Sequence, residues 1–420
     1  MMMKDRMMKT HGHSRIEMVL LIVGIVLVAS NLRASLTTVG PLIGAIVSDT
    51  GLSNALAGLL TTLPLIAFAV LSLLAPKIAR LFGMEYTLLA SLIVLTAGII
   101  LRSLPSVVAL FIGTGVLGLA IAVGNVLLPS LVKREFPNCV GLMTGVYSMS
   151  MNIWGAIASG VSVPIAQGFS LGWRRTLMCW AIFSAVAVIV WFPQLRFRHQ
   201  PSPYSGAKGR ELWGSRLAWQ VTLFMGLQSL GFYAAVAWIP EMLHDRGISI
   251  STAGWMLSLM QFVSLPVTFI IPVLAGRLSN QRGLVTIIAL LYLVGYAGLL
   301  MGGTRWISLW IILIGIGQGA SISLALTFIS LRASNADQAA ELSGMAQSIG
   351  YLLAAVGPVL FGFLHDLTHA WTISILLLML ASVFQLIVGL GAGRNAQIAP
   401  LQSFQQDVSK AQNKKPLEIN

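Results

Sequence analysis

The sequence predicts an all-α polytopic membrane protein with twelve transmembrane helices arranged as two six-helix repeats. Three observations support this prediction: an apolar, charge-poor composition, twelve apolar segments of membrane-spanning length, and a residue pattern that recurs between the two halves. Hydrophobic residues make up 56% of the 420 residues and charged residues only 9%, and the mean hydropathy is +0.85. Soluble domains carry about 25% charged residues, so a soluble fold is excluded.

The apolar segments can be placed in chain order, since a helix of about 20 residues crosses the hydrocarbon core of a bilayer. Glycine and proline are tolerated inside such helices, because neighbouring helices satisfy the backbone groups that they leave free. The twelve expected spans are 16–47, 54–76, 86–101, 106–131, 139–167, 176–193, 217–240, 250–276, 284–301, 306–331, 338–364 and 370–392. They predict a first six-helix bundle within 1–193, a basic linker at 194–216, a second bundle within 217–393 and a disordered polar tail at 394–420.

Basic residues fall unequally on the two sides of these spans. Of the 26 lysines and arginines, twenty lie on the side of the N-terminus, five lie on the other side, and Arg33 lies within the first span. Segments that stay in the cytoplasm carry such an excess of positive charge. Both termini, the linker and the tail are therefore expected to be cytoplasmic, and the net charge of +13 reflects membrane orientation rather than nucleic-acid binding.

Residues around the second span recur around the eighth at a constant shift of 196 positions. The matched pairs are Asp49 with Asp245, Gly51 with Gly247, Ser53 with Ser249, Ala57 with Ala253, Gly58 with Gly254, Pro76 with Pro272 and Ala79 with Ala275. A sparser set follows at 199 positions: Gly118 with Gly317, Lys133 with Arg332, Thr144 with Ser343 and Gly145 with Gly344. Since six spans separate the copies, both halves have the same orientation, and parallel repeats of this kind place a solute site near the membrane midplane between them.

A single arginine, Arg33, lies about 25 Å along the first predicted helix, because each residue advances a helix by about 1.5 Å. Its guanidinium keeps its charge, and exposure to lipid would cost several kcal/mol, so the side chain should face protein or a wet cavity. Ser30, Thr37, Pro41 and Gly44 share its helix face. We interpret this polar face as part of a solute pathway. The alternative is an arginine that only caps carbonyls or pairs with a neighbour.

Other polar and aromatic side chains occur at mid-depth of the later spans. Buried amides must find hydrogen-bond partners, and aromatic rings offer flat apolar faces. The further candidates for solute binding are Thr37, Asn125, Tyr147, Asn152, Gln228, Gln261, Gln318, Gln347 and Tyr351. With Arg33 they predict a polar cavity, uncharged apart from one arginine, that suits a small planar anion or a polar heterocycle. Each alone could instead form an interhelical hydrogen bond, and the small residues of 148–159 could serve helix packing.

The sequence carries no constellation typical of an enzyme. It has no phosphate-cradling Gly-Lys-Ser/Thr motif and no metal-ligand spacing around Cys139 or Cys179, so we expect no catalytic site, no metal and no cofactor. No aspartate or glutamate falls at mid-depth of a span, where proton-driven carriers commonly place a relay. An exchanger or facilitator is therefore expected rather than a strict proton-driven pump.

Short motifs connect the chain to a known family. The segments APKIARLFG (75–83) and IPVLAGRLSNQRG (271–283) look like degenerate copies of the loop motif of the major facilitator superfamily, with its acidic residue absent from both. The segments LRASLTTVGPL (32–42), GNVLLPSLVKR (124–134) and LSGMAQSIGYL (342–352) resemble the cyanate porter family within it. The resemblance implies the major facilitator fold, a bacterial inner membrane and alternating access by two rocking halves. It also implies secondary active or facilitative transport of a small anion or polar nitrogen-containing solute, cyanate-like or nitroimidazole-like.

Two other functions stay open at this point. A broad-specificity drug exporter would be recognised by competition among many unrelated apolar compounds. A membrane receptor that moves nothing would give no flux in proteoliposomes. For the transporter, the expected partners are a small-molecule solute and membrane lipid, and the chain is expected to act as a monomer.

Overall fold

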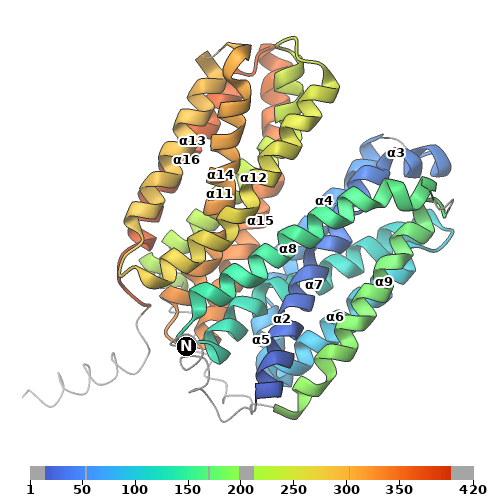
Figure 1. Cartoon of the computed structure of the whole chain (residues 1–420), viewed down its shortest axis with the longest axis vertical. Helices are drawn as coiled ribbons and strands as arrows, with labels where there is room; N and C mark the ends of the chain where they lie inside the picture. The colour runs from blue at the N-terminus through green and yellow to red at the C-terminus, as the bar shows by residue number, and fades with distance from the viewer. Residues whose placement is uncertain (1–14, 53, 169–170, 198–211, 302, 399–420) are drawn as a thin grey trace, which may run out of the picture.

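The computed structural model describes residues 15–52, 54–168, 171–197, 212–301 and 303–398, and its regular elements are helices (Figure 1). Residues 1–14, residues 198–211 of the predicted linker and the predicted tail from residue 399 lie outside the described residues. The first half comprises α2 (Arg15–Thr37), α3 (Val39–Thr50), α4 (Asn54–Ser72), α5 (Ala75–Phe82), α6 (Met84–Arg102), α7 (Val107–Glu135), α8 (Val140–Val163), η1 (Pro164–Gly168), α9 (Gly172–Trp191) and η2 (Phe192–Phe197). The second half comprises α11 (Arg216–His244), α12 (Ile250–Arg277), α13 (Arg282–Met301), η3 (Thr304–Trp306), α14 (Ile307–Arg332), α15 (Ala336–Thr368) and α16 (Thr372–Ala392).

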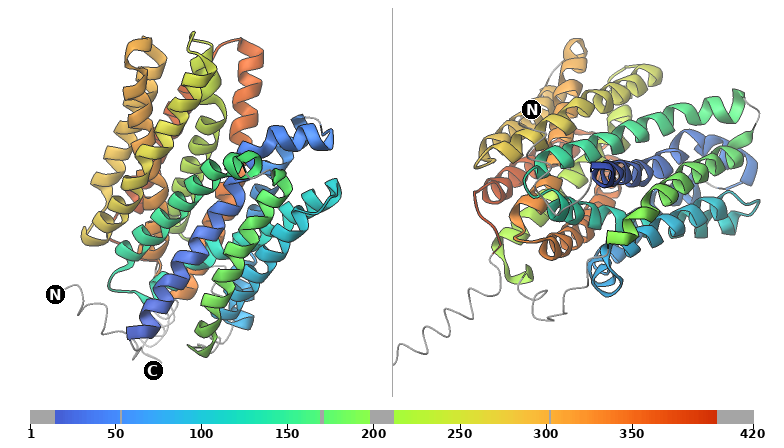
Figure 2. Two further views of the ribbon diagram at one scale, coloured as in Figure 1. Left: turned by 45° about the vertical axis from the view of Figure 1, so that its right-hand side comes forward. Right: turned by 60° about the horizontal axis from the view of Figure 1, so that its bottom comes forward.

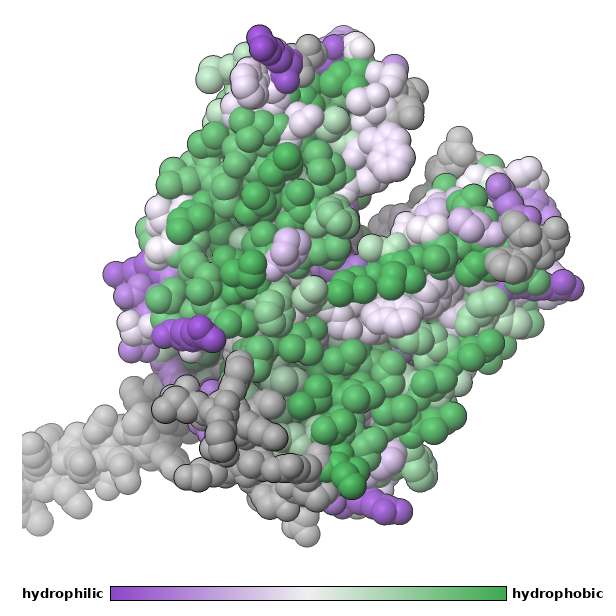
Figure 3. Space-filling model, viewed as in Figure 1, coloured by the Kyte–Doolittle hydropathy of each residue, from purple (hydrophilic) through white to green (hydrophobic). Residues whose placement is uncertain are grey.

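The helices are of membrane-spanning length and apolar on their outer surfaces. In the described part of the chain, 11 helices are long and apolar enough to cross a membrane, or 12 when the bent pair of α4 and α5 is one span. Large apolar side chains such as Ile182, Ile189 and Val359 are 69%, 70% and 74% exposed. On the face that Figure 3 shows, apolar side chains cover much of the surface of both halves. Water would penalise such a surface and lipid would not, so the prediction of a twelve-span all-α membrane protein is confirmed.

Two segments predicted as single helices are interrupted. The segment 16–47 is divided at Thr38 into α2 and α3, because Pro41 has no N–H for the carbonyl of Thr37 and its ring crowds that carbonyl. The segment 54–76 ends as α4 at Ser72, and α5 turns away by 55°. Pro76 lies in the first turn of α5, where its missing N–H has no helical partner to lose.

The predicted duplication recurs in the hydrogen bonds of the two halves. Trp173, near the start of α9, donates its indole N–H to Asp49 Oδ2 at 3.1 Å. Trp371, just before α16, donates in the same way to Asp245 Oδ2 at 2.7 Å. Asp49 and Asp245 are a predicted repeat pair. Equivalent carboxylates therefore accept equivalent bonds from the last span of each half.

The two halves meet on one side of the molecule, which we call the terminal side because α2 begins and α16 ends there. Gly145 of α8 packs against the backbone of α12, and a Cβ added to it would lie 2.9 Å from Phe269 O. Gly344 of α15 packs against α4, and a Cβ added to it would overlap Ser72 O. Gly145 and Gly344 are a predicted repeat pair, so these two glycine contacts are copies of each other.

An ion pair reinforces the glycine contacts on the terminal side. Arg80 of α5 pairs with Glu341 of α15 across the boundary between the halves. Arg80 belongs to the loop motif at 75–83, whose own acidic residue is absent. The first turns of α15 thus provide the carboxylate that the motif lacks.

Away from the terminal side the two halves diverge. The blue-to-green helices of the first half lean away from the yellow-to-red helices of the second half in Figure 1 and in the left view of Figure 2. Figure 3 shows the resulting cleft in the molecular surface, open on the side that carries α3. The described conformation is therefore closed on the terminal side and open on the opposite side.

Candidate solute site

Arg33 lies on α2 one turn before the helix ends at Thr37, and its side chain is half-buried. Its guanidinium carbon lies 5.5 Å from the centroid of the Phe232 ring, which belongs to α11 in the second half. A cation at this distance over a ring face is attracted by the negative face of the ring. The arginine predicted to face the solute pathway therefore contacts both halves of the molecule.

Further rings gather around this arginine. Tyr233 of α11 and Tyr351 of α15 both interact electrostatically with Arg33. The Tyr351 ring packs on Phe68 of α4, with ring centroids 4.9 Å apart and planes tilted by 57°. We call Phe68, Phe232, Tyr233 and Tyr351 the aromatic cluster. The aromatic cluster thus contains rings from both halves of the molecule, and it lies beside the positive charge of Arg33.

No carboxylate pairs with Arg33 in the part of the chain that the structure describes. Among the described residues, ion pairs form at Arg80, Arg134 and Arg174, each near the end of a helix. A half-buried cation without a counter-ion is costly, and a ligand that supplies negative charge or electron-rich oxygens lowers this cost. The site therefore has the electrostatics of an anion-binding site with aromatic walls.

The side chain of Arg33 packs against α8. A Cβ on Gly155 would lie 2.7 Å from Arg33 Cγ, so only glycine lets the arginine stem lie against this helix. Thr37 donates its hydroxyl to Gly155 O at 2.8 Å. Of the predicted candidates, Thr37 thus joins α2 to α8 one turn from Arg33.

Hydrogen bonds between the halves lie next to the aromatic cluster. Gln347 Nε2 donates to the backbone carbonyl of Asn125 at 2.8 Å and to Ser343 Oγ at 2.8 Å. Ser348, the next residue of α15, donates to Ala69 O of α4. Gln347 precedes Tyr351 by one turn and Ala69 adjoins Phe68, so these bonds lie within about one turn of the aromatic cluster. Gln347 and Asn125, both predicted candidates, thus join the two halves there, Asn125 through its backbone.

Two predicted candidates lie in the cores of the halves and are not brought to Arg33. Tyr147 is 1% exposed within the hydrophobic core of the molecule. Gln228 is 3% exposed and donates to Ser229 Oγ at 2.6 Å and to Met225 Sδ at 3.3 Å on its own helix. Their polar groups thus lie inside the helix packing of a half.

No side-chain hydrogen bond forms within the described residues at Gln318, Asn152 or Gln261. Gln318 of α14 is 3% exposed, and both polar atoms of its amide lack a partner there. Asn152 of α8 and Gln261 of α12 are half-buried. The buried amide of Gln318 has unused hydrogen-bonding capacity, whereas Asn152 and Gln261 are open enough for solvent to satisfy theirs.

A different arginine caps the end of α2. Arg102, the last residue of α6, is 0% exposed and donates from Nη1 to Ser35 O at 2.8 Å. Ser35 lies in the last turn of α2, where carbonyls lose their helical partners and a positive charge is favoured by the helix dipole. Within the described residues, Arg102 thus caps the end of α2, and the Arg33 guanidinium donates no hydrogen bond to a carbonyl there.

Sequence reasoning missed three members of the aromatic cluster: Phe68, Phe232 and Tyr233. In the span 217–240 the sequence prediction named Gln228 because it is polar, and it did not name Phe232 or Tyr233. The available signal was the position of Phe232-Tyr233 directly after Gly231, in the middle of the first span of the second half. Internal duplication matches that span to the one that carries Arg33.

Comparison with known proteins identifies relatives over nearly the whole chain. A model of the Major Facilitator Superfamily matches residues 25–358 and 227–400. The chain is 50% identical over 390 residues to the uncharacterized transporter YycB of Bacillus subtilis (strain 168), covering 92% of this chain and 97% of that protein. It is 44% identical over 383 residues to the 2-nitroimidazole transporter of Escherichia coli (strain K12), covering 90% and 97%. The cyanate transport protein CynX of Escherichia coli (strain K12) is 26% identical over 345 residues, covering 82% and 89%.

Solved structures match the fold at low sequence identity. The transporter FucP, in an outward conformation, has a TM-score of 0.73 at 12% identity, over 89% of this chain and 99% of that chain. The proton:xylose symporter XylE has a TM-score of 0.72 at 14% identity, over 92% and 98%. These matches extend through both halves of the described chain.

Proposed function

The chain belongs to the major facilitator superfamily, and from this premise we propose that it carries a small planar anion or polar nitrogen-containing solute by alternating access. Its class, a multi-pass membrane transporter, follows from the family and the fold. The nature of the solute and the residues that bind it are the proposal.

One observation carries the choice of solute: the guanidinium of Arg33 lies beside the aromatic cluster and has no carboxylate partner among the described residues. A guanidinium donates two parallel N–H bonds to a planar group such as a carboxylate or a nitro group. The rings of Phe232 and Tyr351 offer flat faces for the remainder of such a solute. An elongated apolar drug would leave the Arg33 charge without a partner.

The names of two relatives support this proposal. The 2-nitroimidazole transporter is 44% identical to this chain and the cyanate transport protein CynX is 26% identical. Both named solutes are small and contain nitrogen, and both offer electron-rich atoms to a guanidinium. The higher identity favours a nitroimidazole-like solute over a cyanate-like one.

The geometry supports a rocking mechanism. A solute that enters the cleft meets Arg33 from the first half and Phe232, Tyr233 and Tyr351 from the second. By pairing with Arg33 it lowers the desolvation cost of bringing the open ends of the halves together over the charge. Opening of the terminal side then requires the glycine contacts and the Arg80–Glu341 pair to separate. Contacts between glycine and backbone separate without rotamer changes, which suits rigid-body motion.

The proposed orientation follows from the basic residues. The positive-inside rule assigns the terminal side, with both termini, to the cytoplasm of a bacterial cell. The cleft of the described conformation would then open to the outside of the inner membrane. No acidic residue pairs with Arg33 in the described chain. We therefore expect an exchanger or a facilitator rather than a strict proton-driven pump.

A thermal-shift screen of the purified protein tests the proposed solute class. Cyanate, nitrate, small carboxylates and 2-nitroimidazole are compared, because a ligand at about 100 times its Kd stabilises the folded state by about 2.7 kcal/mol. At least one planar anion or nitro compound should raise the melting temperature of the wild type and leave Arg33→Gln unshifted. Arg175→Gln, at an exposed arginine, is the control and should keep the response. An equal shift in Arg33→Gln, or stabilisation by apolar drugs alone, would contradict the proposal.

A further inference from the structure

Each half has an arginine at the end of its fourth span, half-buried in the first half and buried in the second. In the first half, Arg134 of α7 binds two carboxylates, with Nη2 2.6 Å from Glu85 Oε1 and Nε 2.7 Å from Glu135 Oε1. The two carboxylates are only 4% and 7% exposed, and the cavity between these groups is about 10 Å³. The positive charge is therefore fully compensated within the chain.

The second half keeps the arginine but not the carboxylates. Arg332 of α14 follows Arg134 by 198 positions, one short of the 199-residue shift that pairs it with Lys133, and Gln281 follows Glu85 by 196. Arg332 Nη2 donates to Gln281 Oε1, as Arg134 Nη2 does to Glu85 Oε1. The residues 198 and 199 positions after Glu135 are Ala333 and Ser334, and neither is acidic. The second half thus has the same arginine hydrogen bond but no negative charge at the positions of Glu85 and Glu135.

The arginine is deeply buried and incompletely bonded. Arg332 is 3% exposed. Its Nη1 donates to Ala396 O at 3.3 Å, and its Nε has no hydrogen-bond partner within the described residues. A buried cation that faces only neutral groups is destabilising, because it has given up water without gaining a counter-ion.

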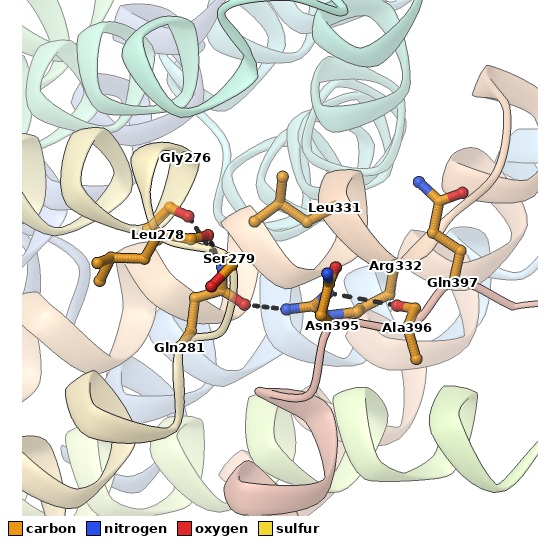
Figure 4. A pocket seen from close by; sticks show the side chains of 10 residues that line it. Gly276, Leu278, Ser279, Gln281, Leu331, Arg332, Asn395, Ala396 and Gln397 are labelled. Carbon is orange, nitrogen blue, oxygen red and sulfur yellow. Dashed lines mark hydrogen bonds between the residues drawn. The ribbon is translucent and has the colours of Figure 1, made fainter.

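A cavity of about 410 Å³ lies beside this arginine. Its polar lining residues are Ser279, Gln281, Arg332, Asn395 and Gln397 (Figure 4). No acidic residue of the described chain lines it, and every polar side chain there can donate a hydrogen bond. The segment after α16 encloses the cavity, since Gln281 N–H donates to Gly393 O and Ile398 N–H donates to Arg332 O, both at 2.8 Å.

We propose that this cavity binds a phosphate-bearing anion, whose oxygens pair with Arg332 and accept hydrogen bonds from Ser279 and Asn395. Its position favours the headgroup of an anionic phospholipid over soluble phosphate. Arg277 and Arg332 end two of the candidate membrane spans, at the depth where headgroups lie. A phosphate diester has the negative charge and the oxygens that Glu85 and Glu135 supply in the first half. The inference holds whichever solute the transporter carries.

The test compares the full-length wild type with Gln281→Glu, which restores the carboxylate of the first half. Melting temperatures are measured in detergent micelles that contain phosphatidylglycerol or phosphatidylcholine, and separately with inorganic phosphate or chloride at constant ionic strength. Phosphatidylglycerol should raise the melting temperature of the wild type by several degrees above phosphatidylcholine. Most of this rise should be lost in Gln281→Glu, whose new carboxylate occupies Arg332.

Arg305→Gln is the matched control, because it also lowers the net charge by one and lies at an exposed position on the other side of the membrane spans. It should keep the full response to phosphatidylglycerol. A wild-type response to phosphatidylglycerol alone supports a lipid headgroup, and an equal response to inorganic phosphate supports a soluble ligand in the same site. Equal responses in the wild type and Gln281→Glu would overturn the proposal. So would an absent wild-type response.

Discussion

The substitution Gly145→Ala should shift the transporter away from the conformation described here. Its Cβ would lie 2.9 Å from Phe269 O, whereas a carbon and a carbonyl oxygen in contact lie about 3.3–3.6 Å apart. The start of α8 must therefore move away from α12 by about 0.5 Å, and overpacking of this kind costs about 1–3 kcal/mol. The clash exists only while the terminal side is closed. The ratio of closed to open terminal sides should accordingly fall by a factor of about 5–150.

Thiol labelling measures this shift. Ser72→Cys, in a background with Cys139→Ser and Cys179→Ser, places a reporter at a position that is 0% exposed while the terminal side is closed. Labelling in inside-out vesicles should be faster in the Gly145→Ala variant. Gly160→Ala is the matched control on the same helix, since a Cβ there meets nothing within 4 Å. Unchanged labelling in Gly145→Ala would refute the assignment of the glycine contacts as the closure of the terminal side.

Three further outcomes follow from the same account. Glu341→Gln removes the ion pair with Arg80, so it should also speed labelling on the terminal side. Exchange of the two charges (Arg80→Glu with Glu341→Arg) should restore the slow labelling rate. If the double variant is labelled as fast as Glu341→Gln, the ion pair does not hold the halves together. Single cysteines placed in the linker at 194–216 should resist a membrane-impermeant thiol reagent in intact cells, and labelling without permeabilisation would overturn the orientation. An imposed pH gradient should drive little accumulation of solute, and strong uphill transport that a protonophore and Glu241→Gln both abolish would contradict an exchanger or facilitator.

The number and order of the membrane spans were predictable because a lipid environment requires long apolar segments in the sequence. Each span must be apolar along its length, and a duplicated chain repeats residues such as Asp49 and Asp245 that have fixed positions in both copies. Arg33 was predictable for the same reason, since a charge within an apolar span is costly and therefore conspicuous. The interruption at Thr38 was not predicted, because membrane helices often tolerate a proline such as Pro41 without ending.

The composition of the site was only partly predictable. A polar residue inside a span signals a pathway or an interhelical bond, and only the fold decides which. Gln228 bonds on its own helix, whereas Gln347 bonds to a backbone carbonyl in the other half. Phe232 and Tyr233 gave no comparable signal, since aromatic residues in an apolar span usually pack in the core or against lipid. Their role depends on which helix of the second half faces Arg33, and periodicity within one helix does not contain that information.

The most direct test of the central claim is solute flux per folded molecule in Arg33 variants. Purified wild type, Arg33→Gln and Arg33→Lys are checked for monodispersity, reconstituted into proteoliposomes and assayed with the ligand identified by thermal shift. Arg33→Gln should remain monodisperse, because Arg33 has no ion-pair partner among the described residues, and it should lose transport. Arg33→Lys should keep at most weak flux, since an ammonium supplies the charge without the planar pair of donors. Normal flux per folded Arg33→Gln molecule would remove Arg33 from the site and contradict the account.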